Sequence, residues 1–262
     1  MRENLPISAR IGCVPYLNAR PLLEGLTYHV TKLVPARLFE AYQAGECDAA
    51  LLSSIDVITR PDPLVVDGVS IASRGEVYSV FLAYTGELQS LKEITLDLSS
   101  HTSNALLQIV LSEFYAIQPK YVQLTDINIG ITPTGGSQLF IGDPAITLRK
   151  RTTDPDIHFL DLGAEWFRMT GLPFVFALWL LRNDFTKKKL LAESLREAKT
   201  RGLSNRDAIA KKTADPEFTR RYLSHCIRYD LGEDEKKGLT LFSELLTKNK
   251  ITNKFCDKLN YI

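Results

Sequence analysis

Short apolar segments alternate with amphipathic segments over the first two thirds of this chain, and that alternation constrains the fold most strongly. Each apolar segment has the length and the bounding residues that are typical of a buried strand. The sequence predicts strands over residues 7–14, 28–35, 47–52, 69–73, 77–84, 93–97, 120–124, 138–141 and 172–181. Helical spacing of apolar residues lies between several of them, at residues 36–44, 106–114 and 161–170. Strands that alternate with helices favour stacked α/β layers with largely parallel sheets.

The chain changes character beyond Thr186, where the sequence predicts helices and no strand. The predicted helices cover residues 186–201, 204–213, 216–229 and 233–248. Asp215, Pro216 and Glu217 are typical of a helix start, because an acidic cap precedes Pro at the first helical position.

The order of these segments indicates one α/β unit inserted into another. Residues 85–179 form the inserted lobe, and residues 1–84 with 180–262 form the other. The chain would cross twice between the lobes, at the strand-like segments 77–84 and 172–181. Two lobes joined by two crossings have a hinge and a cleft, and small ligands often bind between domains.

Composition narrows the function. Lys and Arg number 32 and Asp and Glu 31, so the net charge of +1 provides no broad basic field for nucleic acid or an anionic membrane. The apolar run 172–181 is far shorter than the roughly 20 residues that span a bilayer. The N-terminal segment lacks the continuous apolar stretch of a signal peptide. We therefore expect a cytoplasmic protein with a small-molecule ligand.

The cysteines and histidines predict no metal site. Cys13, Cys47, Cys226 and Cys256 have no C-x-x-C spacing, and no histidine cluster accompanies them. We expect reduced thiols, as in a cytoplasm.

Polar residues follow the first predicted strand, where α/β proteins place ligands. Tyr16, Asn18 and Arg20 offer a phenol, an amide and a guanidinium there. The alternative is a Pro-containing turn in which Asn18 caps a helix.

Residues 97–103 join a predicted strand to a helix and carry several hydroxyl groups. Ser100, Thr102 and Ser103 lie where free backbone N–H groups would receive a carboxylate or a phosphate. Ordinary capping by Ser or Thr is the alternative, and His101 is either a proton-transfer group or a solvent-facing side chain.

Two further positions are candidates. Gly142 and Asp143 end the predicted strand 138–141; the glycine permits close backbone approach, and the aspartate either contacts a ligand or caps the next helix. Ser79 lies on a crossing segment, where its hydroxyl either faces the cleft or is a tolerated strand residue.

Taken together, the segments resemble one known family in the same order. VPYLNARPLLEGL is similar to its S-Y-L-N-x-x-P-L signature, and GECDAALLSSIDVI to its G-x-x-D-x-A-L-x-x-S segment. The further matching blocks are EVYSVFL, LDLSSHTSNALLQIVLSEFY, LFIGDPAI, DLGAEWFRMTGLPFVFALW and YLSHCIRYDLGEDEKKGLTLF. The resemblance covers about residues 8–245, and the family is that of the chorismate dehydratases of the futalosine route to menaquinone.

The resemblance implies a fold like the type II periplasmic binding proteins, with two α/β lobes, a cleft and a two-strand hinge. It implies a lyase reaction in which chorismate loses water to give 3-[(1-carboxyvinyl)oxy]benzoate. It also implies that no metal or organic cofactor takes part. The oligomeric state stays open.

The resemblance also assigns roles to residues. Asn18, from the Tyr-Leu-Asn motif, is expected to be the catalytic polar contact and Ser79 a second contact. Tyr16 and Ser54, which lie in the first two matching segments, are expected to bind substrate. Arg is more usual in the family where His101 stands, so His101 would be a weaker, pH-dependent contact to a carboxylate.

The matching blocks contain no obvious carboxylate base. Asp97 and Asp143 lie at strand ends and are interpreted as structural. Our hypothesis is that the enolpyruvyl carboxylate of the substrate takes the ring proton, while the protein supplies the geometry.

Three other functions compete with this one. A non-catalytic protein that binds small anions would share the fold, because fold does not fix function. Dihydroxynaphthoate synthase, a sister enzyme of the same pathway, shares the fold but has a different opening motif. An effector-binding regulator would need a DNA-binding helix pair, which the sequence does not predict.

Overall fold

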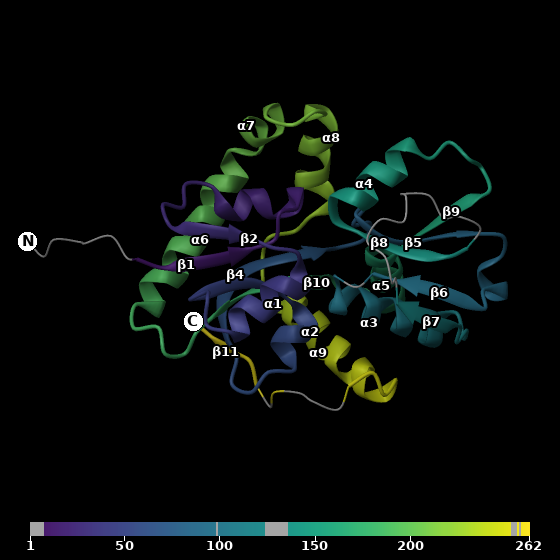
Figure 1. Cartoon of the computed structure of the whole chain (residues 1–262), viewed down its shortest axis with the longest axis horizontal. Helices are drawn as coiled ribbons and strands as arrows, with labels where there is room; N and C mark the ends of the chain where they lie inside the picture. The colour runs from purple at the N-terminus through teal and green to yellow at the C-terminus, as the bar shows by residue number, and fades with distance from the viewer. Residues whose placement is uncertain (1–7, 98, 124–135, 253–255, 257) are drawn as a thin grey trace, which may run out of the picture.

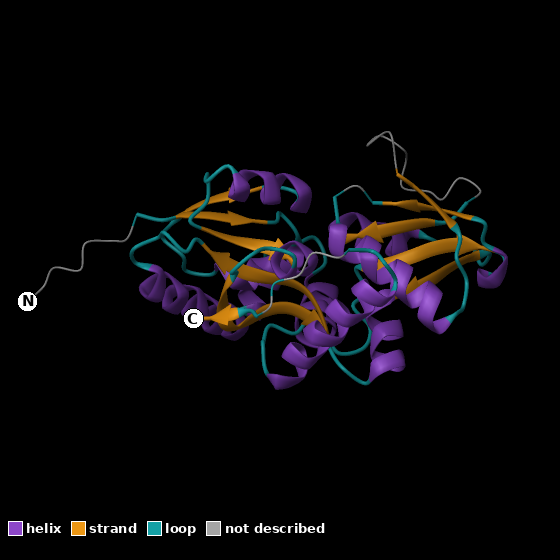
Figure 2. Ribbon diagram, turned by 90° about the horizontal axis from the view of Figure 1, so that it is seen from below, coloured by secondary structure: helices purple, strands orange, loops and turns teal. Residues whose placement is uncertain are grey.

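The computed structural model describes residues 8–97, 99–123, 136–252, 256 and 258–262. Their strands form two mixed sheets, each covered by helices, which lie side by side along the long axis of the molecule (Figures 1 and 2). We call the sheet with the chain's first strand and its helices the first lobe, and the other sheet with its helices the second lobe.

The first lobe has the strand order β11-β4-β10-β3-β1-β2. Its strands are β1 Arg10–Cys13, β2 His29–Lys32, β3 Ala49–Ser53, β4 Leu64–Ser73, β10 Phe174–Leu181 and β11 Asn260–Tyr261. The second lobe has the order β7-β6-β8-β5-β9. Its strands are β5 Val80–Thr85, β6 Glu93–Leu96, β7 Lys120–Gln123, β8 Gln138–Ile141 and β9 Ile157–Asp161.

The helices pack around the two sheets (Figure 1). The second lobe carries α3 His101–Ile109, with a π-helical turn Val110–Phe114, α4 Gly142–Arg151 and α5 Leu162–Thr170. The first lobe carries α1 Pro35–Gln43, α2 Ser54–Ile58, α6 Lys188–Ser204, α7 Arg206–Lys211, α8 Pro216–Arg221, with a π-helical turn Tyr222–Cys226, and α9 Glu233–Lys248. Short 3-10 helices cover Leu17–Leu23 and Leu88–Ser90. Helix α9 contacts both β10 and α3, so it links the lobes.

The prediction of largely parallel sheets is wrong for the strands near the crossings. Strands β1, β2 and β3 pair in parallel, as do β6, β7 and β8. However, β10 pairs antiparallel with both β3 and β4, and β5 pairs antiparallel with both β8 and β9. The reason is that β10 returns from the second lobe and enters the first sheet in the direction opposite to β4.

The sheets also place the crossings differently from the predicted boundaries at residues 84/85 and 179/180. The whole of β5 belongs to the second sheet, and the whole of β10 to the first. The chain therefore changes lobe at residues 74–79 and 171–173. Apolar patterning reveals that a strand is buried, but it does not reveal which sheet receives its hydrogen bonds.

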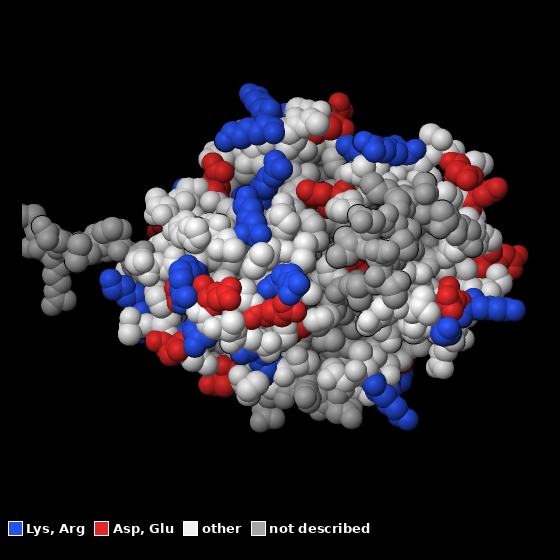
Figure 3. All heavy atoms as spheres, viewed as in Figure 1, with Lys and Arg blue, Asp and Glu red and all other residues white. Residues whose placement is uncertain are grey.

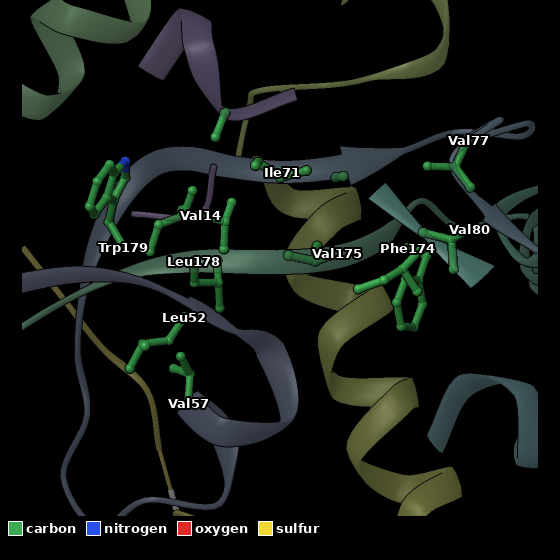
Figure 4. Close-up of a cluster of buried hydrophobic side chains, with 14 of the residues drawn as sticks. Val14, Leu52, Val57, Ile71, Val77, Val80, Phe174, Val175, Leu178 and Trp179 are labelled. Carbon is green, nitrogen blue, oxygen red and sulfur yellow. The ribbon is translucent and has the colours of Figure 1, made fainter. Parts of the chain in front are cut away.

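The apolar segments are buried because helices cover both faces of the sheets. All five residues of β3 are buried, and Leu178 and Trp179 of β10 are inaccessible to solvent. Figure 4 shows Leu178 and Trp179 with Leu52 of β3, and with Val77 on the crossing and Val80 at the start of β5. A single apolar cluster runs through both lobes, so the lobes pack tightly against each other beside the cleft.

The C-terminal segment is helical as predicted, apart from the short strand β11 and one isolated bridge to β4. Asp215 caps α8 by accepting a hydrogen bond from the backbone N–H of Phe218 at 3.0 Å. Strand β11 pairs in parallel with β4, and Arg228 forms a bridge with Ala72, so the prediction of no further strand is wrong. Two-residue pairings at a sheet edge have no apolar periodicity that a sequence could reveal.

Candidate active site

A pocket lies between the lobes, at the carboxyl ends of β1, β3 and β8. The first lobe lines it with Val14, Tyr16, Asn18, Ser53 and Phe176, and the second with Val80, Ser100, Ser103, Ile141 and Gly142. Together with its opening to solvent, the space between its walls is about 580 Å³. Among the described residues that line it, none carries a formal charge.

Asn18 lies at this pocket on the 3-10 helix that follows β1. Its backbone carbonyl accepts a hydrogen bond from the Tyr229 hydroxyl at 2.9 Å, which fixes the backbone. Its side-chain Oδ1 is buried and has no hydrogen-bond partner among the residues that the structure describes. A buried acceptor without a partner is costly, so its presence beside a pocket marks a place for a ligand donor.

Gly142 and Tyr16 meet on the opposite wall. Gly142 has φ +65°, and a Cβ there would lie 2.8 Å from atoms of the Tyr16 ring. The close approach expected of Gly142 is therefore made by an aromatic side chain of the same pocket. Burial raises the pKa of Tyr16 to about 12, so this phenol is neutral and can donate a hydrogen bond at neutral pH.

Asp143 is next in sequence but does not line the pocket. Its Oδ1 accepts a hydrogen bond from the backbone N–H of Leu17 at 2.9 Å, which ties α4 to the Tyr-Leu-Asn segment. Burial raises the pKa of Asp143, and the Leu17 N–H and the Arg20 guanidinium oppose that rise. Arg20 is exposed and faces a separate hollow that Asp143 and Lys150 also line.

Ser100 and Ser103 line the pocket at the start of α3. Ser100 caps the helix: its Oγ accepts from the Ser103 N–H at 3.2 Å and donates to the Ser103 Oγ at 2.8 Å. Asp97 turns the chain into the helix by accepting from the Ser99 N–H at 2.7 Å. The helix start therefore presents hydroxyl-bearing residues to the pocket at the positive end of the α3 dipole, and this arrangement suits a carboxylate.

Three predicted substrate contacts do not line the pocket: Thr102 and His101 join the lobes, and Ser54 ties α2 to β10 within the first lobe. Thr102 Oγ1 accepts from the Ile55 N–H at 3.0 Å, and His101 Nδ1 lies 2.8 Å from Asp56 Oδ1. The hydrogen bond from Asp56 raises the pKa of His101. Ser54 Oγ donates to the Val175 carbonyl at 2.6 Å. Periodicity could not separate these residues from their neighbours, because α2 and α3 meet only in the folded chain.

Ser79 is fully buried behind the pocket wall. Its Oγ accepts from the Tyr222 hydroxyl at 2.8 Å. The preceding residue, Tyr78, has a positive φ of 65°, which is strained for a non-glycine residue. Asp161 holds this segment by accepting from the N–H groups of Val77 at 3.0 Å and Tyr78 at 2.8 Å.

Sequence reasoning missed the residues behind the pocket. Tyr222 and Tyr229 come from the helical tail, and their hydroxyls reach Ser79 and Asn18. Asp161 was expected only to begin a helix, which it does by accepting from the Ala164 N–H at 3.0 Å. A tyrosine within a helical pattern looks like an ordinary core residue, so no local signal could have found the first two.

Three further findings bear on the class of protein. Over the described ranges, no group of three or more His, Cys, Asp or Glu side chains is arranged to hold a metal ion. In the same part of the chain, every helix is too short or too polar to cross a membrane. Lys and Arg mix with Asp and Glu over the face that Figure 3 shows, without a single-sign patch.

Known proteins of similar structure share the fold. The structure resembles an Archaeoglobus fulgidus protein with TM-score 0.69 at 16% identity, covering 94% of this chain and 98% of that one. It also resembles the periplasmic aliphatic sulphonate binding protein SsuA of Escherichia coli, with TM-score 0.61 at 15% identity and 96% of both chains covered. A Candida albicans protein described as having the generic periplasmic binding protein fold has TM-score 0.62 at 14% identity, covering 98% and 97%. The chain has this fold, as predicted.

The comparison of sequences identifies the family, whereas the comparison of structures identifies only the fold. The chain is 33% identical to the chorismate dehydratase of Thermus thermophilus over 260 residues, covering 90% of this chain and 94% of that protein. It is 26% identical to the chorismate dehydratase of Campylobacter jejuni, covering 87% and 88%. The model of the family described as menaquinone biosynthesis matches residues 9–248. This chain belongs to the menaquinone biosynthesis family.

Proposed function

We propose that this protein is a chorismate dehydratase, which removes water from chorismate to give 3-[(1-carboxyvinyl)oxy]benzoate. The extensive match to the Thermus thermophilus enzyme supports this proposal. So does one observation of the structure: the pocket holds a buried, unpartnered amide oxygen on Asn18 and no charged lining residue among those described.

This reaction depends more on how the protein places the substrate than on a strong base supplied by the protein. Loss of the C3 proton and the C4 hydroxyl makes the ring aromatic, which drives the reaction. The protein must hold the substrate, contact the leaving hydroxyl and place a base near the C3 proton. A pocket of neutral donors and acceptors suits these tasks when the substrate carries its own carboxylates.

The start of α3 is the proposed seat for one carboxylate of chorismate. Ser100 and Ser103 present hydroxyls there, and the free N–H groups of the first turn add a favourable partial charge. Asn18, on the opposite lobe, makes the proposed contact to the leaving hydroxyl, and Tyr16 bounds the ring. Ser79, behind the wall, acts through the hydrogen bonds described below.

The enolpyruvyl carboxylate of the substrate is the proposed base. The two carboxylates at the predicted strand ends are already engaged, Asp97 by the Ser99 N–H and Asp143 by the Leu17 N–H. Asp97→Asn and Asp143→Asn variants that fold should therefore still turn over chorismate. An Asp143→Asn variant that binds chorismate but makes no product would contradict this part of the proposal.

The direct experiment mixes the purified chain with chorismate and follows the aromatic enol ether by chromatography. Product formation supports the proposal, and chorismate that binds unchanged supports the alternative, a non-catalytic small-anion-binding protein of this fold. If chorismate neither binds nor reacts, the sister reaction of dihydroxynaphthoate synthase is the one to test.

We further propose that the protein works in the cytoplasm. Cys13, Cys47 and Cys226 are buried thiols outside any disulfide, and burial raises the pKa of each. Thiols kept reduced are typical of a reducing compartment. We also propose that the two sheets move as lobes about the crossings at residues 74–79 and 171–173.

A further inference from the structure

We propose that Tyr222 is a positioning residue for the reaction: its buried hydroxyl fixes the hydroxyl of Ser79 in the orientation that turnover requires. This inference rests on the proposed function. It concerns a side chain of the C-terminal helical segment that does not itself line the pocket.

Tyr222 lies at the meeting point of three parts of the chain. Its side chain is almost inaccessible to solvent, and its hydroxyl donates to the Ser79 Oγ at 2.8 Å. Ser79 belongs to the crossing into the second lobe, whereas Asn18 belongs to the segment after β1 in the first lobe. Tyr222 holds the side chain of Ser79, and Tyr229 from the same tail holds the backbone of Asn18.

The direction of the hydrogen bonds gives the phenol its role. Because Tyr222 donates to the Ser79 Oγ, the proton of Ser79 points elsewhere, and its other acceptor is the Val77 carbonyl at a long 3.5 Å. That proton is thus held weakly and stays available. Without Tyr222, the Ser79 hydroxyl could rotate freely, because no other donor to it is present among the described residues.

The local backbone supports this placement. Tyr222 begins a π-helical turn at the end of α8, a feature that often marks functional sites. Tyr229, just beyond that turn, donates to the Asn18 carbonyl at 2.9 Å. The tail thus holds the backbone of Asn18 through one tyrosine and the hydroxyl of Ser79 through another.

The test is Tyr222→Phe, which removes the hydroxyl and keeps the ring stack on Phe218. We expect kcat for chorismate to fall about 30-fold while KM changes less than about threefold, because orientation and not binding is lost. Tyr42→Phe is the matched control, since Tyr42 is also buried but lies on α1 away from the pocket. The control should keep wild-type kcat.

A double-mutant cycle separates positioning from a general structural effect. In a Ser79→Ala background, Tyr222→Phe should reduce kcat at least about fivefold less than it does in the wild type, because the two groups act as a unit. An undiminished effect, or a wild-type kcat for Tyr222→Phe, overturns the inference. If Tyr222→Phe does not fold, Ser79→Ala alone tests the same hydrogen bond, and a wild-type kcat for it overturns the inference.

The activity of the wild-type chain distinguishes a failure of the proposed function from a failure of the role proposed for Tyr222. If the wild-type chain does not consume chorismate, both proposals are overturned. If the wild-type chain makes the product and Tyr222→Phe makes it equally fast, only the role of Tyr222 is overturned.

Discussion

Ser100 and Ser103 line the pocket, whereas His101 and Thr102, which lie between them in the sequence, contact α2 in the other lobe. The helix explains the difference, because residues three apart share a face and the two between them point elsewhere. One helix start thus faces a ligand with one side and holds the lobes together with another. The polar groups around the cleft therefore fall into two sets: those that line the pocket and can contact a ligand, and those whose hydrogen bonds join the two lobes.

Asn18 is the extreme case of a group left for a ligand, and its replacement should have the largest effect. Asn18→Asp keeps the shape and puts a carboxylate in a pocket otherwise without charge among its described lining residues. We expect kcat/KM for chorismate to fall about 10³-fold, in the range of losses at preorganised polar contacts. The thermal midpoint should fall as well, because the new carboxylate is partly buried without a charged partner in the described pocket lining. Full activity in steady-state kinetics would remove Asn18 from the proposed mechanism.

Gly142→Ala tests whether the backbone of the second lobe sets the position of Tyr16. The new Cβ would have φ +65° and would lie 2.8 Å from the Tyr16 ring, so the ring must move. We expect about 1–3 kcal/mol less stability in denaturant unfolding and about tenfold lower kcat/KM.

Gly171→Ala provides the control for backbone strain. Gly171 has φ +70° at the end of α5, with open space around its Cβ position. This variant should lose similar stability from strain alone but keep wild-type kcat/KM. Equal losses of activity in both variants would show that contact with Tyr16 is irrelevant.

The residues that sequence could predict are those whose role is local. The cap of α3 by Ser100, the cap of α8 by Asp215 and the buried strand β3 follow from patterns within a few residues. The residues it could not predict depend on distant partners. Tyr222 contacts Ser79 from 143 positions away, and His101 contacts Asp56 from 45 positions away. Similarly, the antiparallel entry of β10 depends on where the chain returns, which periodicity does not encode.

Thr102→Val and Ser103→Ala sharpen the comparison within α3. Thr102→Val keeps the shape but leaves the Ile55 N–H without its acceptor at a lobe contact. We expect about 1–2 kcal/mol less stability and a KM within twofold of wild type. Ser103→Ala removes a hydroxyl from the pocket, so we expect KM to rise about fivefold with stability changing by less than about 1 kcal/mol. Kinetics and urea unfolding of both variants check this, and the opposite pattern would reverse the two roles.

His101 should show the smallest effect, and one that depends on pH. Asp56 holds the pKa of His101 above its ordinary value, so the folded chain binds this proton more tightly than the unfolded chain. The pair therefore contributes its full stability below the unfolded pKa of about 6.5, and the contribution is lost as the pH rises through the folded-state pKa. Because the His101 side chain is 47% exposed, solvent screening limits the contribution to less than about 1 kcal/mol.

Two substitutions separate this pair from a role in substrate binding. His101→Gln should flatten the dependence of the unfolding free energy on pH between about 5 and 9. His101→Arg should keep the charge near Asp56 at every pH in that range, and it should leave KM for chorismate within twofold of wild type, because the side chain pairs with α2 and does not line the pocket. A KM that falls tenfold in His101→Arg would instead mean that position 101 reaches a substrate carboxylate when the cleft is occupied, and that the helix start serves the ligand with both of its sides.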